Sequence, residues 1–478
     1  MFTIKHLTQG VQGRETPQCS AFVLQHQPTY VFIATMTSTD DTIVSTATPA
    51  GVGGVGIVRI SGADAGSIGQ RILGCLPEPR VATLRSFKAP DGDAVDTGIA
   101  LYFPAPRSFT GEDVIELHGH GGPVVMAMLI DTAVALGARR AEPGEFSKRA
   151  FLNNKLDLAQ AEAIADLIKS GTSQAARAAL RSLSGEFSAA VNTLVAKVTK
   201  LRMHVEAAID FPEEEIDFLS DKALLDRLDD CDKTFSELLT SATVGRVLRD
   251  GYQVVLVGKP NAGKSSLMNR LSGEETAIVT EVAGTTRDIL REQINLDGLS
   301  VELIDTAGLR DNPDVVEQEG IRRAREAMRN ADAVMWVQDA TDTEPGEISE
   351  NIPDGIPVLV VRNKSDLTGT VEHGSNTVVS LSAKTGDGID RLREHLRELA
   401  GYSNLGEGAF TARRRHVDAL QLAATHFAAG KEALEKSRAG ELLAEELRLC
   451  AKSLGEITGA VSSDDLLGQI FSSFCIGK

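Results

Sequence analysis

The stretch Val254-Val-Leu-Val-Gly-Lys-Pro-Asn-Ala-Gly-Lys-Ser265 decides the fold of the centre of this chain. Four apolar residues indicate a buried strand, and the residues after them match GxxxxGK[ST] and open a helix at about Ser265. The glycines let backbone N–H groups surround phosphates, Lys264 supplies a cation to them, and the Ser265 hydroxyl can bind Mg²⁺. The stretch therefore predicts a phosphate-binding P-loop at the end of a strand.

Two further loops follow in the order that a nucleotide-hydrolysing sheet presents them. Gly284-Thr-Thr-Arg-Asp288 contains Thr286, which can join Mg²⁺ and sense the γ-phosphate. Asp305-Thr-Ala-Gly308 ends the strand 301–304 and can hold both a Mg²⁺-bound water and the γ-phosphate. These loops are the expected switch regions.

Two later motifs indicate which base is bound. Asn363-Lys-Ser-Asp366 follows the apolar strand 358–361, and Asp366 can accept hydrogen bonds from N1–H and the exocyclic amine of guanine. A site built around such donors rejects analogues that lack them by about 10⁴-fold or more. Ser382-Ala-Lys384 follows the strand 377–381, and its backbone N–H is expected to reach O6 of the base. We therefore expect GTP, and not ATP, as the substrate.

The motif residues do not identify the group that activates the attacking water. Ras-like enzymes place a glutamine directly after the Asp-x-x-Gly segment, whereas this chain has Leu309 there. No arginine finger is evident, and Asn261 of the P-loop could instead help to bind a monovalent cation beside the phosphates. The acidic candidates for positioning water are Asp311, Asp314, Glu317 and Glu319, and residue chemistry selects none of them.

The chain of 478 residues is too long for a single hydrophobic core, so several domains are expected. Strand patterns at 42–49 and 57–60, separated by a glycine-rich turn at 51–56, begin an α+β region. Helical periodicity starts at Leu156 and returns after Phe410, on both sides of a region of alternating strands and helices. An α/β domain inserted into an all-α domain is the expected fold, and two separate helical domains are the alternative.

The expected domain boundaries follow from these changes of pattern. Residues 1–40 are an N-terminal extension that is either disordered or not natively translated, with synthesis starting at Met36. The domains are then residues 41–155 (α+β), 156–250 and 402–478 (two parts of one helical domain), and 251–401 (P-loop GTPase).

Composition excludes some partners. No apolar run approaches the roughly 20 residues that a membrane span needs, so no membrane partner is expected. The net charge of −18 argues against a uniformly basic surface for nucleic acid. Residues 413–416 (Arg-Arg-Arg-His) could still contact phosphates, with a solvated helix start as the alternative. The five cysteines show no CxxC spacing, which indicates neither a disulfide framework nor a zinc site and fits a reducing cytoplasm.

From about Asp41 to Lys478 the chain resembles the family of tRNA-modifying GTPases known as MnmE or TrmE. The resemblance is carried by the P-loop through Ser266, by the two switch loops through Arg310, and by the terminal Phe474-Cys-Ile-Gly-Lys478. It is supported by four segments typical of the folate-binding and helical regions of that family, namely residues 53–61, 109–116, 118–123 and 149–157.

The resemblance implies C5 modification of the wobble uridine, position 34 of tRNA, with aminomethyl or carboxymethylaminomethyl groups. The flavoprotein partner MnmG (GidA) would carry the FAD and form a heterotetramer with a homodimer of this chain. GTP hydrolysis would drive a conformational change, and K⁺ would activate it. A tetrahydrofolate derivative, 5-formyl- or methylene-tetrahydrofolate, would bind the N-terminal domain.

The family motifs also imply site residues. K⁺ would be held by Asn261, Thr280, Val282 and Thr285, Mg²⁺ by Ser265 and Thr286, and Glu317 would organise the hydrolytic water. The folate site would be lined by Arg59, Glu116, Lys155 and Lys478. The full set expected to bind GTP is Asn261, Ala262, Gly263, Lys264, Ser265, Ser266, Thr280, Glu281, Val282, Ala283, Gly284, Thr285, Thr286, Asp305, Thr306, Ala307, Gly308, Asn363, Lys364, Asp366, Ser382, Ala383 and Lys384.

Two other function classes compete with this interpretation. A ribosome-assembly or regulatory GTPase without modification chemistry would need an RNA-binding appendage such as a basic KH-like domain, and the sequence shows neither a GXXG clamp in that context nor strong positive charge. A folate-dependent one-carbon transferase would leave the complete set of GTPase motifs without a purpose.

Overall fold

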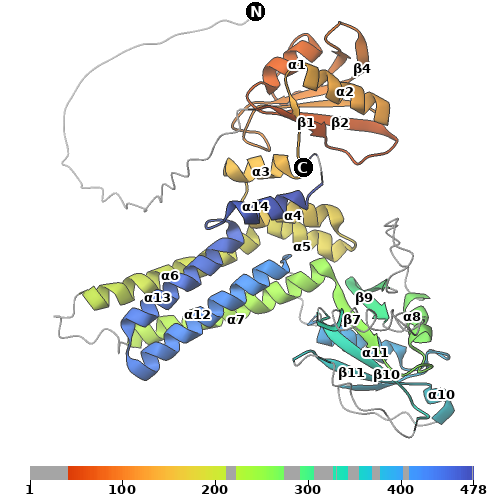
Figure 1. The fold of residues 1–478 in the computed structure, drawn as a ribbon, viewed down its shortest axis with the longest axis vertical. Helices are drawn as coiled ribbons and strands as arrows, with labels where there is room; N and C mark the ends of the chain where they lie inside the picture. The colour runs from red at the N-terminus through yellow and green to blue at the C-terminus, as the bar shows by residue number, and fades with distance from the viewer. Residues whose placement is uncertain are drawn as a thin grey trace, which may run out of the picture. The chain divides into compact units, whose positions relative to one another are not determined.

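The structure is a computed structural model of the chain. It describes residues 41–210, 222–273, 291–305, 327–329, 331–342, 352, 355–368, 377–401, 409–475 and 477. Figure 1 labels the helices and strands along the chain. No helix in the described ranges is long and apolar enough to cross a membrane.

The N-terminal part contains a six-stranded mixed sheet in the order β3-β4-β5-β2-β1-β6. Its strands are β1 (Ile43–Thr46), β2 (Gly53–Ser61), β3 (Thr83–Lys88), β4 (Ala94–Phe103), β5 (Val114–Gly121) and β6 (Arg139–Arg140). The helices α1 (Ala65–Leu73) and α2 (Pro123–Ala135) pack on it, and residues such as Ile60, Phe87 and Leu117 form a fully buried core.

The prediction of a glycine-rich turn at 51–56 is wrong in its extent, because β2 already begins at Gly53. The β2–β5 register shifts between Gly53 and Gly56, so the strand is irregular there. A Cβ at Gly56 would lie 3.0 Å from the Gly121 backbone and would also meet Met126. These glycines therefore allow a close approach within an irregular strand, which the sequence pattern alone does not distinguish from a turn.

The helical part is built from two stretches of the chain. The first supplies α3 (Glu145–Leu152), α4 (Leu158–Lys169), α5 (Ser173–Leu183), α6 (Glu186–Asp210) and α7 (Lys222–Asp250). The second supplies α12 (Arg414–Ser437), α13 (Gly440–Thr458) and α14 (Asp464–Ser472). The helix α4 begins at a capping box in which Asp157 and Gln160 satisfy each other's backbone N–H.

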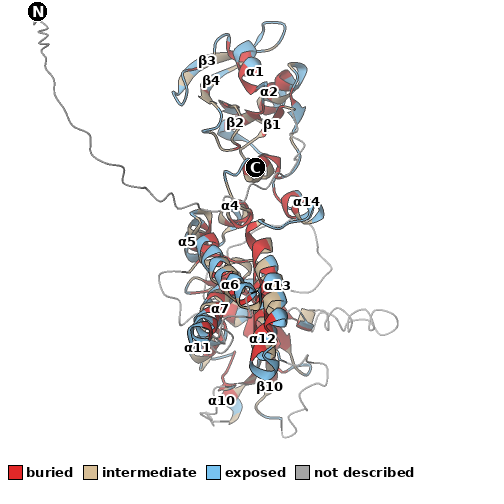
Figure 2. Cartoon of the chain, turned by 90° about the vertical axis from the view of Figure 1, so that its left-hand side faces the viewer, coloured by how far each residue is buried: buried red, intermediate tan, exposed pale blue. Residues whose placement is uncertain are grey.

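Both stretches contribute to one hydrophobic core. Phe187 of α6 stacks on Phe410, with ring centroids 4.7 Å apart, and Phe235 of α7 contacts Phe427 of α12. The long helices α6, α7, α12 and α13 lie side by side, with buried faces turned inward (Figures 1 and 2). The expectation of one helical domain formed by both stretches of the chain is confirmed, and the alternative of two separate helical domains is wrong.

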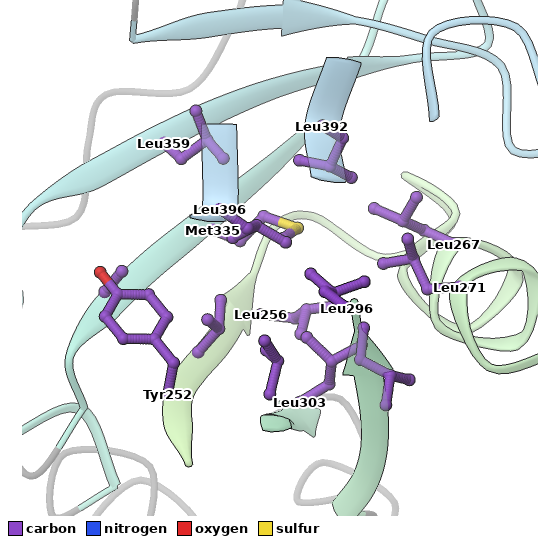
Figure 3. Packing of buried hydrophobic residues seen from close by; sticks show 14 of the residues in the cluster. Tyr252, Leu256, Leu267, Leu271, Leu296, Leu303, Met335, Leu359, Leu392 and Leu396 are labelled. Carbon is purple, nitrogen blue, oxygen red and sulfur yellow. The ribbon is translucent and has the colours of Figure 1, made fainter. Parts of the chain in front are cut away.

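The inserted α/β part has a second six-stranded sheet, in the order β12-β11-β10-β7-β9-β8. The parallel strands are β7 (Tyr252–Val257), β9 (Leu299–Asp305), β10 (Ala333–Asp339), β11 (Val358–Asn363) and β12 (Val378–Ser380), and β8 (Arg291–Leu296) joins antiparallel to β9. Leucines of α8 (Lys264–Gly273) and α11 (Ile389–Leu399) point toward Leu256 and Met335 of the sheet (Figure 3). This core fixes the strand ends at which the predicted motifs lie.

The basic run at 413–416 meets acids of α4, so both predictions made for it are wrong. Arg415 donates to Glu162 at 2.6 Å, Arg413 donates to Asp166 at 2.7 Å, and His416 lies 2.8 Å from Glu162. The Glu162 side chain is only 1% exposed. Three of the four basic residues are thus used inside the protein, and Arg414 alone is exposed.

Candidate nucleotide-binding site

The P-loop connects the end of β7 to the start of α8, as the sequence predicts. Asn261 and Gly263 have φ values of +64° and +92°. A Cβ at Gly263 would overlap the side-chain amide of Asn363, and one at Gly258 would overlap the Val337 carbonyl. The loop is therefore packed so closely against the neighbouring strand ends that only glycine fits at these two positions.

The Lys264 ammonium is held inside the P-loop. Its Nζ donates to the carbonyl oxygens of Gly258 at 2.8 Å and Lys259 at 3.1 Å, and the residue is only 7% exposed. The Ser265 hydroxyl donates to Asp305 Oδ2 at 3.4 Å, which joins the start of α8 to the end of β9. A hydroxyl and a carboxylate are oxygen ligands that Mg²⁺ prefers, and the neighbouring lysine supplies the cation that nucleotide phosphates require.

Asn363 connects three of the predicted loops. Its amide Nδ2 donates to the Ala262 carbonyl of the P-loop at 2.9 Å. Its Oδ1 accepts from the backbone N–H of Lys364 at 2.8 Å and of Ala383 at 3.0 Å. The residue is 2% exposed, so its side chain positions the loops around the base site.

Asp366, the predicted guanine acceptor, is exposed at the start of the short helix α10 (Ser365–Thr368). Its Oδ1 accepts a hydrogen bond from the buried Ser382 hydroxyl at 2.7 Å. This contact brings the Asn363–Asp366 and Ser382–Lys384 segments together, as guanine recognition by both requires.

Sequence reasoning missed Asp339, the last residue of β10. Its Oδ2 accepts from Lys364 Nζ at 2.6 Å, and this hydrogen bond holds the pKa of Asp339 down at about 2 despite some opposing desolvation. The available signal is its position, because an acidic residue that ends a strand of a parallel sheet lies on the edge that carries the other loops.

Several predicted residues lie outside the described residues. These are the cation, Mg²⁺ and nucleotide residues at 280–286, the second switch residues at 306–308, the candidate catalytic Glu317 and the terminal Lys478.

Two of the predicted folate residues meet on the N-terminal sheet, where Arg59 of β2 pairs in register with Glu116 of β5. Arg59 Nε donates to Glu116 Oε1 at 2.9 Å, and the other carboxylate oxygen lies 3.1 Å from His118 Nε2. The Arg59 guanidinium also lies over the Phe109 and Phe146 rings. Lys155 donates to the Pro106 carbonyl at 3.0 Å and is exposed.

The parallel sheet, the closed P-loop and the guanine-type loops joined by Asn363 define the central part as a P-loop GTPase. Models of two families match the chain: the GTP-binding protein TrmE N-terminus over residues 42–155 and the MnmE helical domain over residues 158–475. The chain belongs to the family of tRNA modification GTPases called MnmE.

Relatives match over their full length. The tRNA modification GTPase MnmE of Yersinia pseudotuberculosis (strain PB1/+) is 55% identical, with 92% of this chain and 100% of the relative covered. The protein of the same name from Shewanella loihica is 56% identical over equal shares. A solved G domain of the T. maritima FeoB iron transporter covers 31% of this chain and 98% of its own, at 25% identity and a TM-score of 0.24, which is too low to support an argument.

Proposed function

We propose that this GTPase is the GTP-hydrolysing component that modifies C5 of the wobble uridine, position 34 of tRNA, together with MnmG. The groups added would be aminomethyl or carboxymethylaminomethyl. The proposal rests on the presence of two sites in one chain. One is the P-loop, which Asn363 connects to the loops predicted to bind guanine, and the other is the N-terminal sheet with its Arg59–Glu116 pair. A GTPase that acted only as a binding module would have no use for the second site.

Several residues of the predicted set have a proposed role in GTP binding. Lys264 would neutralise the β- and γ-phosphates, and Ser265 would hold Mg²⁺ together with Thr286, near the carboxylate of Asp305. Asp366 would accept the guanine donors, and the Ser382–Lys384 segment would contact its O6. When bound, Mg²⁺ supplies charge neutralisation to the phosphate oxygens.

We propose that a monovalent cation replaces the missing glutamine and arginine. Asn261 has a positive φ in the P-loop, next to the phosphate site, and its amide oxygen is a suitable ligand for K⁺. Thr280, Val282 and Thr285 would complete the site, and Glu317 would orient the attacking water. When bound, K⁺ would supply the charge stabilisation that an arginine finger supplies elsewhere.

We further propose that a tetrahydrofolate derivative binds against Arg59 and Glu116, with Lys155 and Lys478 also lining the site. A cation suits the glutamate tail, and a carboxylate suits the donors of the pterin. The chain would form a homodimer that assembles with MnmG, which would hold the FAD. Because its substrate is tRNA, we place the protein in the cytoplasm. We also propose the domain boundaries 41–155, 156–250, 251–401 and 402–478, with residues 1–40 as an extension.

Nucleoside analysis of tRNA from a strain that lacks this gene tests the function. We expect the C5 aminomethyl-type groups of wobble uridines to be lost and to return when the gene is restored. Retention of these groups in the deletion strain would refute the modification role and leave the GTPase assignment intact. It would then favour the alternative of a ribosome-assembly or regulatory GTPase.

A further inference from the structure

Asp339 and Lys364 stand at neighbouring strand ends of the α/β sheet. In the parallel pairing of β10 with β11, Asp339 is in register with Asn363, the residue directly before Lys364. Lys364 has a φ of +67°, a conformation uncommon for residues other than glycine. Its ammonium lies 2.6 Å from Asp339 Oδ2. An unusual backbone and an ion pair thus fix the direction of one lysine.

The Asp339 carboxylate is itself fixed. Its Oδ1 accepts from the backbone N–H of Thr341 at 2.9 Å and from the Thr341 hydroxyl at 2.7 Å. The Ala340 N–H donates to the Asn363 carbonyl at 2.8 Å, which ties the same loop to the end of β11. One carboxylate oxygen therefore anchors the loop, and the other receives the lysine.

Lys364 lies between two residues of the nucleotide site. On one side is Asn363, whose amide reaches the P-loop, and on the other is Asp366, the proposed guanine acceptor. A lysine in this place can pack its methylene stem against a bound base while its ammonium stays on an acidic partner. Such packing requires that the stem be held in one rotamer, and holding it costs side-chain entropy when no partner fixes the ammonium.

We propose that Asp339 is a positioning residue for guanine nucleotide binding: it holds the Lys364 ammonium and so presents the lysine stem to the base. The inference rests on the GTP site proposed above. It assigns Asp339 no part in the chemical step. The residue acts on nucleotide affinity, through the rate of dissociation, and not on turnover at saturating GTP.

The test is the binding of fluorescent GDP to the full-length chain carrying Asp339→Asn. We expect the Kd to rise about tenfold, the lower end of what one charged hydrogen bond contributes, because both side chains keep some contact with water. The kcat for GTP should stay unchanged while KM rises. Asp339→Glu keeps the charge and should recover part of the affinity.

Asp297→Asn is the matched control, because Asp297 lies in the turn before β9, at the opposite end of the strands from the P-loop, and pairs with Arg397 at 2.8 Å. It should bind GDP as the unaltered chain does. Lys364→Met retains an apolar stem without the charge, and adding Asp339→Asn to it should cause no further loss. Additive losses, or an Asp339→Asn protein with unaltered affinity, would overturn the inference.

Asp366→Ala distinguishes a failure of the positioning role of Asp339 from a failure of the proposed guanine site. If Asp366→Ala weakens GDP binding and Asp339→Asn does not, the positioning role is wrong and the guanine site stands. If Asp366→Ala leaves GDP binding unaltered, the proposed guanine site itself is wrong.

Discussion

Glu116 has a charged or polar partner on each of its carboxylate oxygens, Arg59 on one and His118 on the other. Its side chain is 14% exposed, so it faces a partly dehydrated surface of the N-terminal sheet. A carboxylate fixed by two partners in this way can still accept further hydrogen bonds, since each oxygen has two acceptor positions. This is the basis for assigning it the donors of a pterin ring.

Glu116→Gln should weaken the binding of 5-formyl-tetrahydrofolate by about tenfold or more, because an amide replaces one acceptor oxygen with a donor and removes the charge. Calorimetric titration of the full-length chain measures this. Glu78→Gln, at an exposed position near the same sheet, is the control and should bind as the unaltered chain does. Equal affinities for the Glu116→Gln and unaltered proteins would remove Glu116 from the folate site.

Single residues also show how far sequence reasoning reaches in the site. Ser265 and Asp305 lie within hydrogen-bond distance because a P-loop and an Asp-x-x-Gly segment have fixed places on a parallel sheet, and the sequence motifs alone indicate this. Asn363 connects three loops, and Asp339 pairs with Lys364. Both depend on contacts between segments far apart in the sequence. No local pattern records such contacts.

The helices α4 and α12 are joined by a compact group of charges. Glu162 and Asp166 are one turn apart on α4 and receive Arg413, Arg415 and His416 from the start of α12. Burial alone would raise the pKa of Glu162, but His416 and the forked Arg415 hold it well below its usual range. Burial lowers the pKa of His416, whose Nδ1 accepts the backbone N–H of Arg413 at 3.0 Å and whose Nε2 lies 2.8 Å from Glu162.

Glu162→Gln should lower the free energy of unfolding of the helical part by about 3–5 kcal/mol, the usual cost of leaving buried charges without their partner. Denaturant unfolding followed by far-ultraviolet circular dichroism measures the loss. Glu432→Gln is the control, since Glu432 pairs with Lys436 on an exposed face of α12 and should matter little. A Glu162→Gln protein as stable as the control would show that this cluster does not hold α4 to α12.

The helices themselves could be predicted from apolar periodicity, and the insertion of the α/β part followed from helical patterns on both of its sides. The contacts that residues 413–416 make could not be predicted in this way. A run of basic residues at a helix start has the same pattern whether it faces water, phosphate or a buried acid. Only the packing of α12 against α4, across an insertion of more than a hundred residues, brings Glu162 to it.

The chain as a whole combines a P-loop GTPase with family-typical N-terminal and helical parts, and GTP turnover is the event that would drive its work on tRNA. Leu309 stands where a water-positioning glutamine is expected, so the proposed hydrolysis depends on a cation for activation. If K⁺ supplies the missing charge stabilisation, turnover must depend on which monovalent ion is present, while ATP must remain a poor substrate in either ion.

The deciding measurement is the rate of GTP hydrolysis by the purified full-length chain in KCl and in NaCl at the same ionic strength, with ATP run in parallel. We expect turnover in K⁺ to exceed that in Na⁺ by about tenfold or more, and ATP hydrolysis to be negligible in both. Equal GTP turnover in the two salts would contradict cation activation, and hydrolysis of ATP as fast as GTP would contradict the guanine site.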